Sequence, residues 1–308
     1  MKKNARVKPN PKRFKETVCS SPSELLPFLL THYPALSRNN VKRLLASRQV
    51  LINGAAVSQF DFPLSKGDVV SISPSRGKKK AFAERIRILY EDEELLAIDK
   101  PHGLLSVSDD REKEKTAYRL AMDYVRQSDA RKRIFVVHRL DKETSGVLIF
   151  AKNEELKNAL QDRWNQIVSK REYLAVCEGL FEKKEGTRTS YLLSTKTRLM
   201  YSSHAGKDGK KAVTSYRVIA ENGAYSLLRV NISTGRKNQI RVHMKDLSHQ
   251  VVGDEKYASA SDPLNRLGLH AHILEFDHPF VEGKHFKFVS PCPKEFLQFF
   301  DLKRLPRT

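Results

Sequence analysis

Short apolar runs separated by turn residues recur along the chain from residue 86 to residue 289. Runs of this length that are rich in β-branched and aromatic residues are typical of buried strands. They predict strands over residues 86–90, 95–99, 134–137, 147–151, 173–176, 212–219, 225–232, 269–276 and 285–289. Helical spacing of apolar residues predicts helices over residues 116–127, 153–168, 239–247 and 293–300. Many strands with interspersed helices predict an α+β domain, built on a mostly antiparallel mixed sheet with flanking helices.

The part of the chain before this domain has a different pattern. Helices are predicted over 24–30 and over 38–47, the second capped by Ser37. A short strand that enters an Asn-Gly turn is predicted over 50–54, and a turn into a closing strand over 64–72. Residues 1–15 carry seven Lys or Arg residues without an apolar period, which predicts a disordered basic arm that contacts phosphates or serves as a solubilising tail. We therefore predict a basic arm (1–15), a small α+β domain (16–75), a basic linker (76–80) and the main domain (81–308).

The charge of the chain points to its partner. The 56 Lys and Arg residues outnumber the 36 Asp and Glu residues, which gives a net charge of +20. Such a charge attracts polyanions, and nucleic acid is the abundant polyanion of a cytoplasm. A membrane surface is the competing partner, but we find no run of about 18 apolar residues, no long basic amphipathic helix, and no apolar core behind the basic N-terminus. Three scattered cysteines, Cys19, Cys177 and Cys292, predict free thiols in a reducing cytoplasm.

Residues 136–151 contain a polar turn between two of the predicted buried strands. Asp141 lies in this turn among cations, namely His138, Arg139 and Lys142, and Glu143 follows it. Taken alone, an acid among basic residues is most often a salt-bridged turn. Functional groups are also commonly carried by loops that rigid elements anchor, so the turn is the first candidate site.

The order "SRNNVKRLLASRQVLINGAAV…LSKGDVVSI" in the small domain resembles the α-L RNA-binding module, which is named for small-subunit ribosomal protein four. The resemblance covers residues 23–73, although Ser23-Glu24-Leu25 replaces the usual Arg-Leu-Asp of that family. Such modules present the second helix and the following turn to structured RNA. The resemblance therefore implies RNA contacts by Arg38, Lys42, Arg43 and Arg48; a generic small α+β domain is the alternative.

The main domain resembles the RluA-type RNA pseudouridine synthases. The block "HRLDKETSGVLIFAK" (138–152) is similar to the signature of that family, with Lys142 where arginine is commoner. Further blocks follow the order of the family: "LLAIDKPHGLL" (95–105), "KREYLAVCEG" (170–179), "TGRKNQIRVHM" (234–244), "VVGDEKY" (251–257) and "LGLHAHILEFDHP" (267–279). The resemblance implies the pseudouridine-synthase fold and the isomerisation of uridine to pseudouridine in RNA, with neither cofactor nor metal.

The resemblance also assigns roles to residues. Asp141 matches the catalytic aspartate, and a carboxylate suits this reaction because breaking a glycosidic bond builds positive charge on the sugar. Tyr173 matches the tyrosine that packs against the target base, and Arg241 matches the arginine that pairs with the aspartate. Arg139 is our candidate to support the flipped-out nucleotide or its phosphate, with a salt bridge to Glu143 as the alternative. The detached uracil must be recaptured, so we expect a pocket from which water is excluded.

Alternative functions remain open at this point. His270 and His272 form an H-x-H pair of a kind that can bind metal, but no third ligand is apparent. A non-catalytic RNA-binding or ribosome-assembly factor could be built on the same two domains, and a nucleic-acid glycosylase would use a similar carboxylate. The RNA-binding module favours ribosomal RNA of the large subunit over transfer RNA as the partner, and we assume a monomer.

Overall fold

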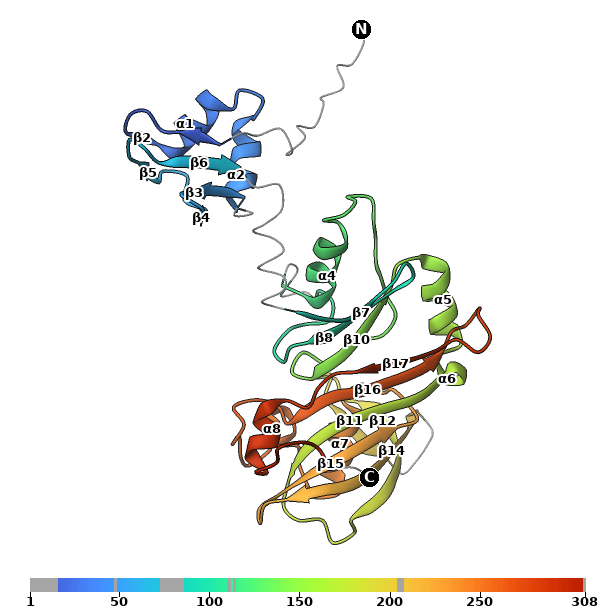
Figure 1. Ribbon diagram of the computed structural model, residues 1–308. Coiled ribbons are helices and arrows are strands. Elements are labelled where there is room, and N and C mark those ends of the chain that lie inside the picture. The colour runs from blue at the N-terminus through green and yellow to red at the C-terminus, as the bar shows by residue number, and fades with distance from the viewer. Residues whose placement is uncertain are drawn as a thin grey trace. The chain divides into compact units, whose positions relative to one another are not determined.

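The computed structural model describes residues 16–46, 49–72, 86–109, 112, 115–203 and 208–306. The chain divides into two units, Met1–Arg85 and Ile86–Thr308, and most of their elements are labelled in Figure 1. The predicted basic arm (1–15), the linker (76–80) and Arg48 lie outside the described residues.

The N-terminal unit pairs two short helices with a small antiparallel sheet. Its elements are β1 (Thr17–Val18), β2 (Ser23–Glu24), α1 (Leu25–His32), α2 (Arg38–Ala46), β3 (Val50–Ile52), β4 (Ala55–Val57), β5 (Pro63–Leu64) and β6 (Val69–Ile72). The strands β1, β6, β3 and β4 are neighbours in that order, while β2 pairs with β5. Both predicted helices are confirmed, and Ser37 caps the second, since its hydroxyl accepts from the Asn40 amide at 3.3 Å.

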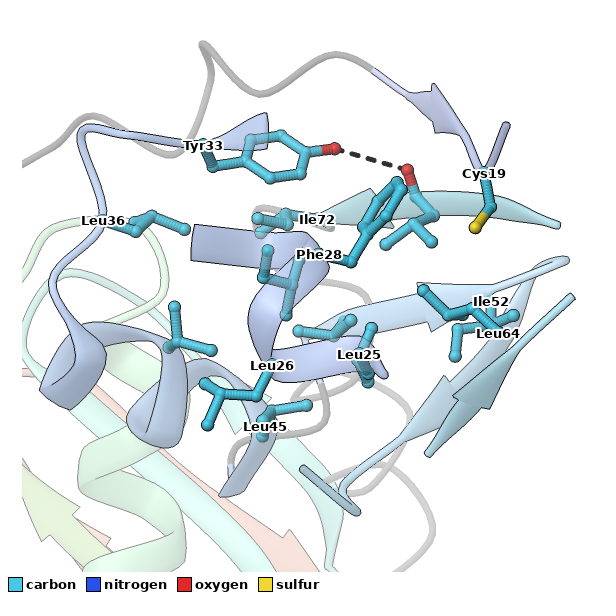
Figure 2. Packing of buried hydrophobic residues seen from close by; sticks show 14 residues of the cluster. Cys19, Leu25, Leu26, Phe28, Tyr33, Leu36, Leu45, Ile52, Leu64 and Ile72 are labelled. Carbon is cyan, nitrogen blue, oxygen red and sulfur yellow. Dashed lines mark hydrogen bonds between the residues drawn. The ribbon is translucent and has the colours of Figure 1, made fainter. Parts of the chain in front are cut away.

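One face of α2 packs against the core of the unit, and the other face is exposed. Val41 and Leu45 are buried with residues of α1 and the sheet, as Figure 2 shows for Leu25, Leu26, Leu45, Ile52 and other labelled members of the cluster. Arg38, Lys42 and Arg43 are exposed. The helix thus exposes three cations to solvent, while its buried face holds it against the core.

The second unit is one large sheet with short helices on its faces. Its strands are β7 (Arg87–Glu91), β8 (Leu95–Lys100), β9 (Phe135–Val136), β10 (Ser145–Ala151), β11 (Val168–Glu178), β12 (Glu185–Ser194), β13 (Met200–Ser203), β14 (Lys210–Glu221), β15 (Tyr225–Ile232), β16 (Leu269–Asp277) and β17 (His285–Val289). Its helices are α4 (Ala117–Val125), α5 (Glu154–Asp162), α6 (Trp164–Ile167), α7 (Gln239–Asp246), the 3₁₀ turn η2 (Glu255–Tyr257) and α8 (Lys294–Phe299). The predicted α+β class is confirmed.

The order of strands along the sheet is β13-β12-β14-β15-β11-β16-β10-β8-β7, with β17 paired to β16 and β9 to β10. Among the described strand pairs only β10 with β16 is parallel; the isolated bridge between Leu105 and Thr116 is parallel as well. The pairing of β10 with β16 puts Gly146 opposite Ala271, and Ala271 is in turn opposite Tyr173 of β11. The neighbouring strands β10, β16 and β11 (Figure 1) therefore bring Gly146, Ala271 and Tyr173 into one row, and the loop that carries Asp141 leads directly into β10.

Alternating side chains of β11 pack against two different helices. Leu174 and Val176 belong to the apolar cluster of α8, whereas Ala175 and Cys177 belong to that of α7. Successive residues of a strand point to opposite faces, so the two helices cover opposite sides of the sheet. This arrangement fixes α7 on the face from which its polar N-terminal residues reach the Asp141 loop.

Two expectations about individual elements are wrong, and two strands were not predicted. The helix predicted over 153–168 breaks at Arg163, so α5 and α6 are separate and Val168 already begins β11. The strand predicted over 134–137 is only the two-residue β9, half-buried, whereas β10 is buried throughout. The strands β12 and β13 were not predicted, because Thr, Arg and Ser residues interrupt the apolar pattern of β12 and β13 is only four residues long.

Candidate active site

Asp141 lies in the loop that leads from β9 into β10. The loop closes on itself, since the Thr144 amide donates to the Asp141 carbonyl at 3.1 Å. The side chain of Asp141 is 31% exposed, so a ligand can reach its carboxylate. The cation that pairs with Asp141 is distant in the sequence. It is Arg241 of α7, whose Nη1 lies 3.7 Å from Oδ2 of Asp141. Salt bridges between Asp141 and the cations next to it in the sequence therefore do not explain this turn.

Arg241 is held in place by a second carboxylate. Its Nε and Nη2 donate to the two oxygens of Asp254 at 2.7 and 2.6 Å, and its guanidinium lies 5.1 Å from the centre of the Tyr257 ring. Although burial opposes the charge, these bonds raise the pKa of Arg241, which stays a cation. The expected pairing of Arg241 with the aspartate is thus present as an ion pair, while the two short hydrogen bonds go to Asp254.

Asp254, Asn238 and Tyr257 are site residues that the sequence analysis did not single out. All three are buried, and each belongs to a block that resembles the family, 234–244 or 251–257. Asn238 is in contact with Asp141 when its amide is oriented to suit its neighbours. The sequence signal was the presence of polar residues in these blocks, but nothing in the sequence said which of them meet.

Tyr173 lines a small pocket next to the Asp141 loop. The pocket walls are otherwise formed by aromatic, cationic and apolar side chains: His138, Val147, Trp164, Arg171, Ala271, Ile273 and Leu274. Burial raises the pKa of Tyr173 to about 12, Arg171 opposes the rise, and the charge of Asp141 adds to it. The phenol therefore keeps its proton at neutral pH.

His138 helps to build this pocket as a neutral group. Its ring lies 5.2 Å from the ring of Trp164, and its Nε2 accepts the Ile149 amide at 3.2 Å. Burial lowers the pKa of His138 to about 4, with a smaller contribution from the charge of Arg171. His138 therefore adds no positive charge beside Asp141, contrary to what its place in the sequence suggests.

Lys100, at the end of β8, ties two loops together. It is fully buried, and its Nζ donates to the carbonyls of Pro101, Leu104 and Lys142 at 2.9, 2.7 and 3.0 Å. Burial lowers the pKa of Lys100 to about 7, while Glu143 and Asp141 oppose that fall. The lysine thus anchors the carbonyl of the residue that follows Asp141, and so restrains the loop from behind.

The remaining predicted site residues are not members of the Asp141–Arg241 ion pair. Arg139 is exposed, and the described partner of Glu143 is Lys142 at 3.4 Å, so the alternative salt bridge to Arg139 is absent among the described ion pairs. Arg38, Lys42 and Arg43 belong to the N-terminal unit. His270 is bonded through Nδ1 to Ser145 and His272 through Nδ1 to the Ser290 carbonyl, at 2.8 and 2.6 Å.

The described residues contain neither a metal-binding cluster nor a helix that could span a membrane. Within the described residues, no group of three His, Cys, Asp or Glu side chains is placed to hold a metal ion. The longest helices described have nine residues, and none of them is long and apolar enough to cross a bilayer.

Known proteins of similar sequence identify the class of protein to which the chain belongs. Residues 94–246 match the family described as RNA pseudouridylate synthase. An RNA pseudouridine synthase of Bacillus subtilis, YlyB, is 32% identical over 86% of this chain and 89% of its own length. The chain therefore belongs to the RNA pseudouridine synthases, which are isomerases, as the resemblance of its motifs implied.

Other relatives differ in the RNA that their names give. The ribosomal large subunit pseudouridine synthase D of Borreliella burgdorferi is 30% identical over 88% of this chain and 87% of its own length. The tRNA pseudouridine synthase C of Haemophilus ducreyi is 36% identical over 62% of this chain and 85% of its own length. Human RNA Pseudouridylate Synthase Domain Containing 4 shares the fold, with a TM-score of 0.60 at 21% identity, over 74% of this chain and 97% of that one.

Proposed function

We propose that the protein converts specific uridines of large-subunit ribosomal RNA to pseudouridine in the cytoplasm, as a monomer, with Asp141 as its catalytic aspartate. The observation that carries the proposal is the accessible Asp141 carboxylate, with Arg241 3.7 Å away and the Tyr173 pocket beside it. Relatives whose names give the large ribosomal subunit match nearly the whole chain, whereas the tRNA enzyme of Haemophilus ducreyi covers 62% of it. This difference favours ribosomal RNA.

The reaction balances without a co-reactant. The bond between the sugar carbon C1′ and uracil N1 breaks, a bond between C1′ and C5 forms, a proton leaves C5, and N1 gains one. The Asp141 carboxylate stabilises or attacks C1′ while positive charge develops there. Tyr173 packs against the base, and its raised pKa makes it a hydrogen-bond donor at neutral pH. The apolar wall of the pocket limits the access of water to the detached base.

The test uses RNA that carries tritium at C5 of uridine. The isomerase releases tritium to water and leaves the mass of unlabelled RNA unchanged, with no free uracil. A glycosylase would release uracil and leave an abasic site, and a ribosome-assembly factor without catalytic activity would bind the RNA and change nothing. Mapping pseudouridine in RNA from cells that lack the protein would identify the target; pseudouridines lost only from tRNA would contradict the ribosomal assignment.

We further propose that the N-terminal unit is an α-L RNA-binding module. Its support is the exposed face of α2, which presents Arg38, Lys42 and Arg43 from a helix anchored by buried Val41 and Leu45. Arg48, two residues after the end of α2, is assigned to the same surface by the resemblance of the sequence. Cations of this kind contact phosphates and position the enzyme on RNA.

Replacing Arg38, Lys42 and Arg43 together by Gln is expected to raise the Kd for RNA about tenfold at physiological salt. Each lost phosphate contact removes roughly 0.7–0.9 from the slope of log Kd against log salt, so the slope should fall by about 2. The matched control replaces three exposed cations of the other unit, Lys183, Lys303 and Arg304, by Gln. An unchanged slope in the first variant would exclude a role of this face in RNA binding, and deletion of residues 1–75 should flatten the slope further.

A further inference from the structure

Asn238 has an unusual place at the start of α7. It is the N-cap residue of the helix in the left-handed conformation, with φ 55° and ψ 21°, and it is only 6% exposed. An N-cap asparagine ordinarily accepts an amide proton of the first helical turn, but no such bond is formed here. The side chain of Asn238 therefore does not cap the helix and can bond to other groups. Its left-handed backbone conformation is one that asparagine tolerates well.

The neighbours of Asn238 dictate the orientation of its amide. Lys256 is a donor only, and an ionised Asp141 is an acceptor only. The amide oxygen therefore faces Lys256 Nζ at 3.1 Å and the Tyr257 hydroxyl at 3.0 Å, while the NH₂ group faces Asp141, 2.7 Å from Oδ2 and 3.3 Å from Oδ1. Burial raises the pKa of Tyr257, so its hydroxyl keeps its proton and donates.

The contact with Asn238 is shorter than the contact with the arginine. Arg241 uses Nε and Nη2 for Asp254, and its remaining Nη1 is 3.7 Å from Oδ2 of Asp141, beyond hydrogen-bond distance. With the Asn238 amide in this orientation, the side-chain hydrogen bond to the Asp141 carboxylate comes from Asn238. One turn of α7 supplies both groups, since residues 238 and 241 are three positions apart and lie on the same side of the helix.

We propose that Asn238 is a positioning residue for Asp141. Its amide holds Oδ2 and fixes the rotation of the carboxylate, which leaves Oδ1 directed to the sugar carbon, while Lys256 and Tyr257 lock the amide in the donating orientation. This inference rests on the proposed function, because it assigns Asn238 a part in the chemistry of Asp141.

The decisive variant is Asn238→Asp. It keeps the shape of the side chain, the tolerance for the left-handed conformation and the acceptor that faces Lys256, but it turns a carboxylate oxygen toward Asp141. At pH 8 we expect kcat to fall 30- to 100-fold, with the KM for RNA within threefold and Tm within a few degrees. At pH 5.5 the gap should narrow to less than tenfold, because two close carboxylates share a proton and Asp at 238 then donates again.

The matched control is Asn265→Asp, the same change at an exposed asparagine that also has a left-handed conformation, with φ 52°. It should leave kcat unchanged at both pH values. A loss in Asn238→Asp that is the same at both pH values, or no loss at all, would overturn the positioning role. If this variant does not fold, Lys256→Met decides: Lys256 is exposed, and kcat at saturating RNA should fall three- to tenfold, whereas an unchanged kcat would refute the inference.

The activity of the wild-type protein distinguishes a failure of the proposed function from a failure of the role of Asn238. If it forms no pseudouridine in either RNA class, the proposed function fails. If it is active and Asn238→Asp is equally active, only the role of Asn238 fails.

Discussion

The Asp141→Asn protein is expected to form no measurable pseudouridine and to bind RNA within about threefold of the wild type. The amide has the shape of the carboxylate but not its charge, so it cannot stabilise or attack the sugar carbon. A loss of at least about 10³-fold in kcat corresponds to about 4 kcal/mol of transition-state stabilisation. The fold should persist, because Arg241 keeps its two short bonds to Asp254.

Release of tritium from C5-labelled RNA measures the rate, and a filter-binding titration measures the affinity. Asp162→Asn is the matched control, since Asp162 is an exposed carboxylate at the end of α5. It should retain full activity. A purified Asp141→Asn protein that keeps more than about a tenth of the wild-type rate would refute the catalytic role of Asp141, whatever its affinity for RNA.

The local half of this site could be predicted from sequence. Apolar runs on both sides of the turn indicated that Asp141 is carried by a loop between strands, and the buried strand β10 confirms that support on one side. The matching blocks indicated Tyr173 and Arg241, which the structure brings to the same region as Asp141. Each of these inferences used residues within one short segment.

The other half depends on contacts between segments, which a local pattern does not encode. That Arg241 would bond to Asp254, and Asn238 to Asp141, follows from the packing of α7 against the sheet. The strand β12 also depends on contacts between segments. Its polar sequence carries little apolar signal, and antiparallel pairing with β14 from Glu185 to Leu192 holds it in the sheet. The apolar period of α5 continues to Trp164, but the chain turns at Arg163, whose guanidinium donates to the Pro279 carbonyl.

The Gly146→Ala protein is expected to lose about 3 kcal/mol or more of stability and to lose activity as well. Gly146 has φ 112°, a conformation in which an L side chain is strained by about 1–3 kcal/mol. An added Cβ would also lie 2.1 Å from the carbonyl oxygen of Ala271, a backbone atom that cannot yield without moving β16. For a unit of this size, the loss should lower Tm by roughly 10 °C.

The loss of activity follows from the row of residues across three strands. Gly146 is paired with Ala271 and Ala271 with Tyr173, so pushing β10 away from β16 separates the Asp141 loop from the Tyr173 pocket. The control is Gly223→Ala, at φ 87° with nothing within 4 Å of an added Cβ. It carries the conformational strain without the clash, and should cost about 1 kcal/mol and leave kcat unchanged. If both variants lost the same stability, or if Gly146→Ala kept its kcat below its melting temperature, the close approach of β10 and β16 would not be what aligns Asp141 with Tyr173.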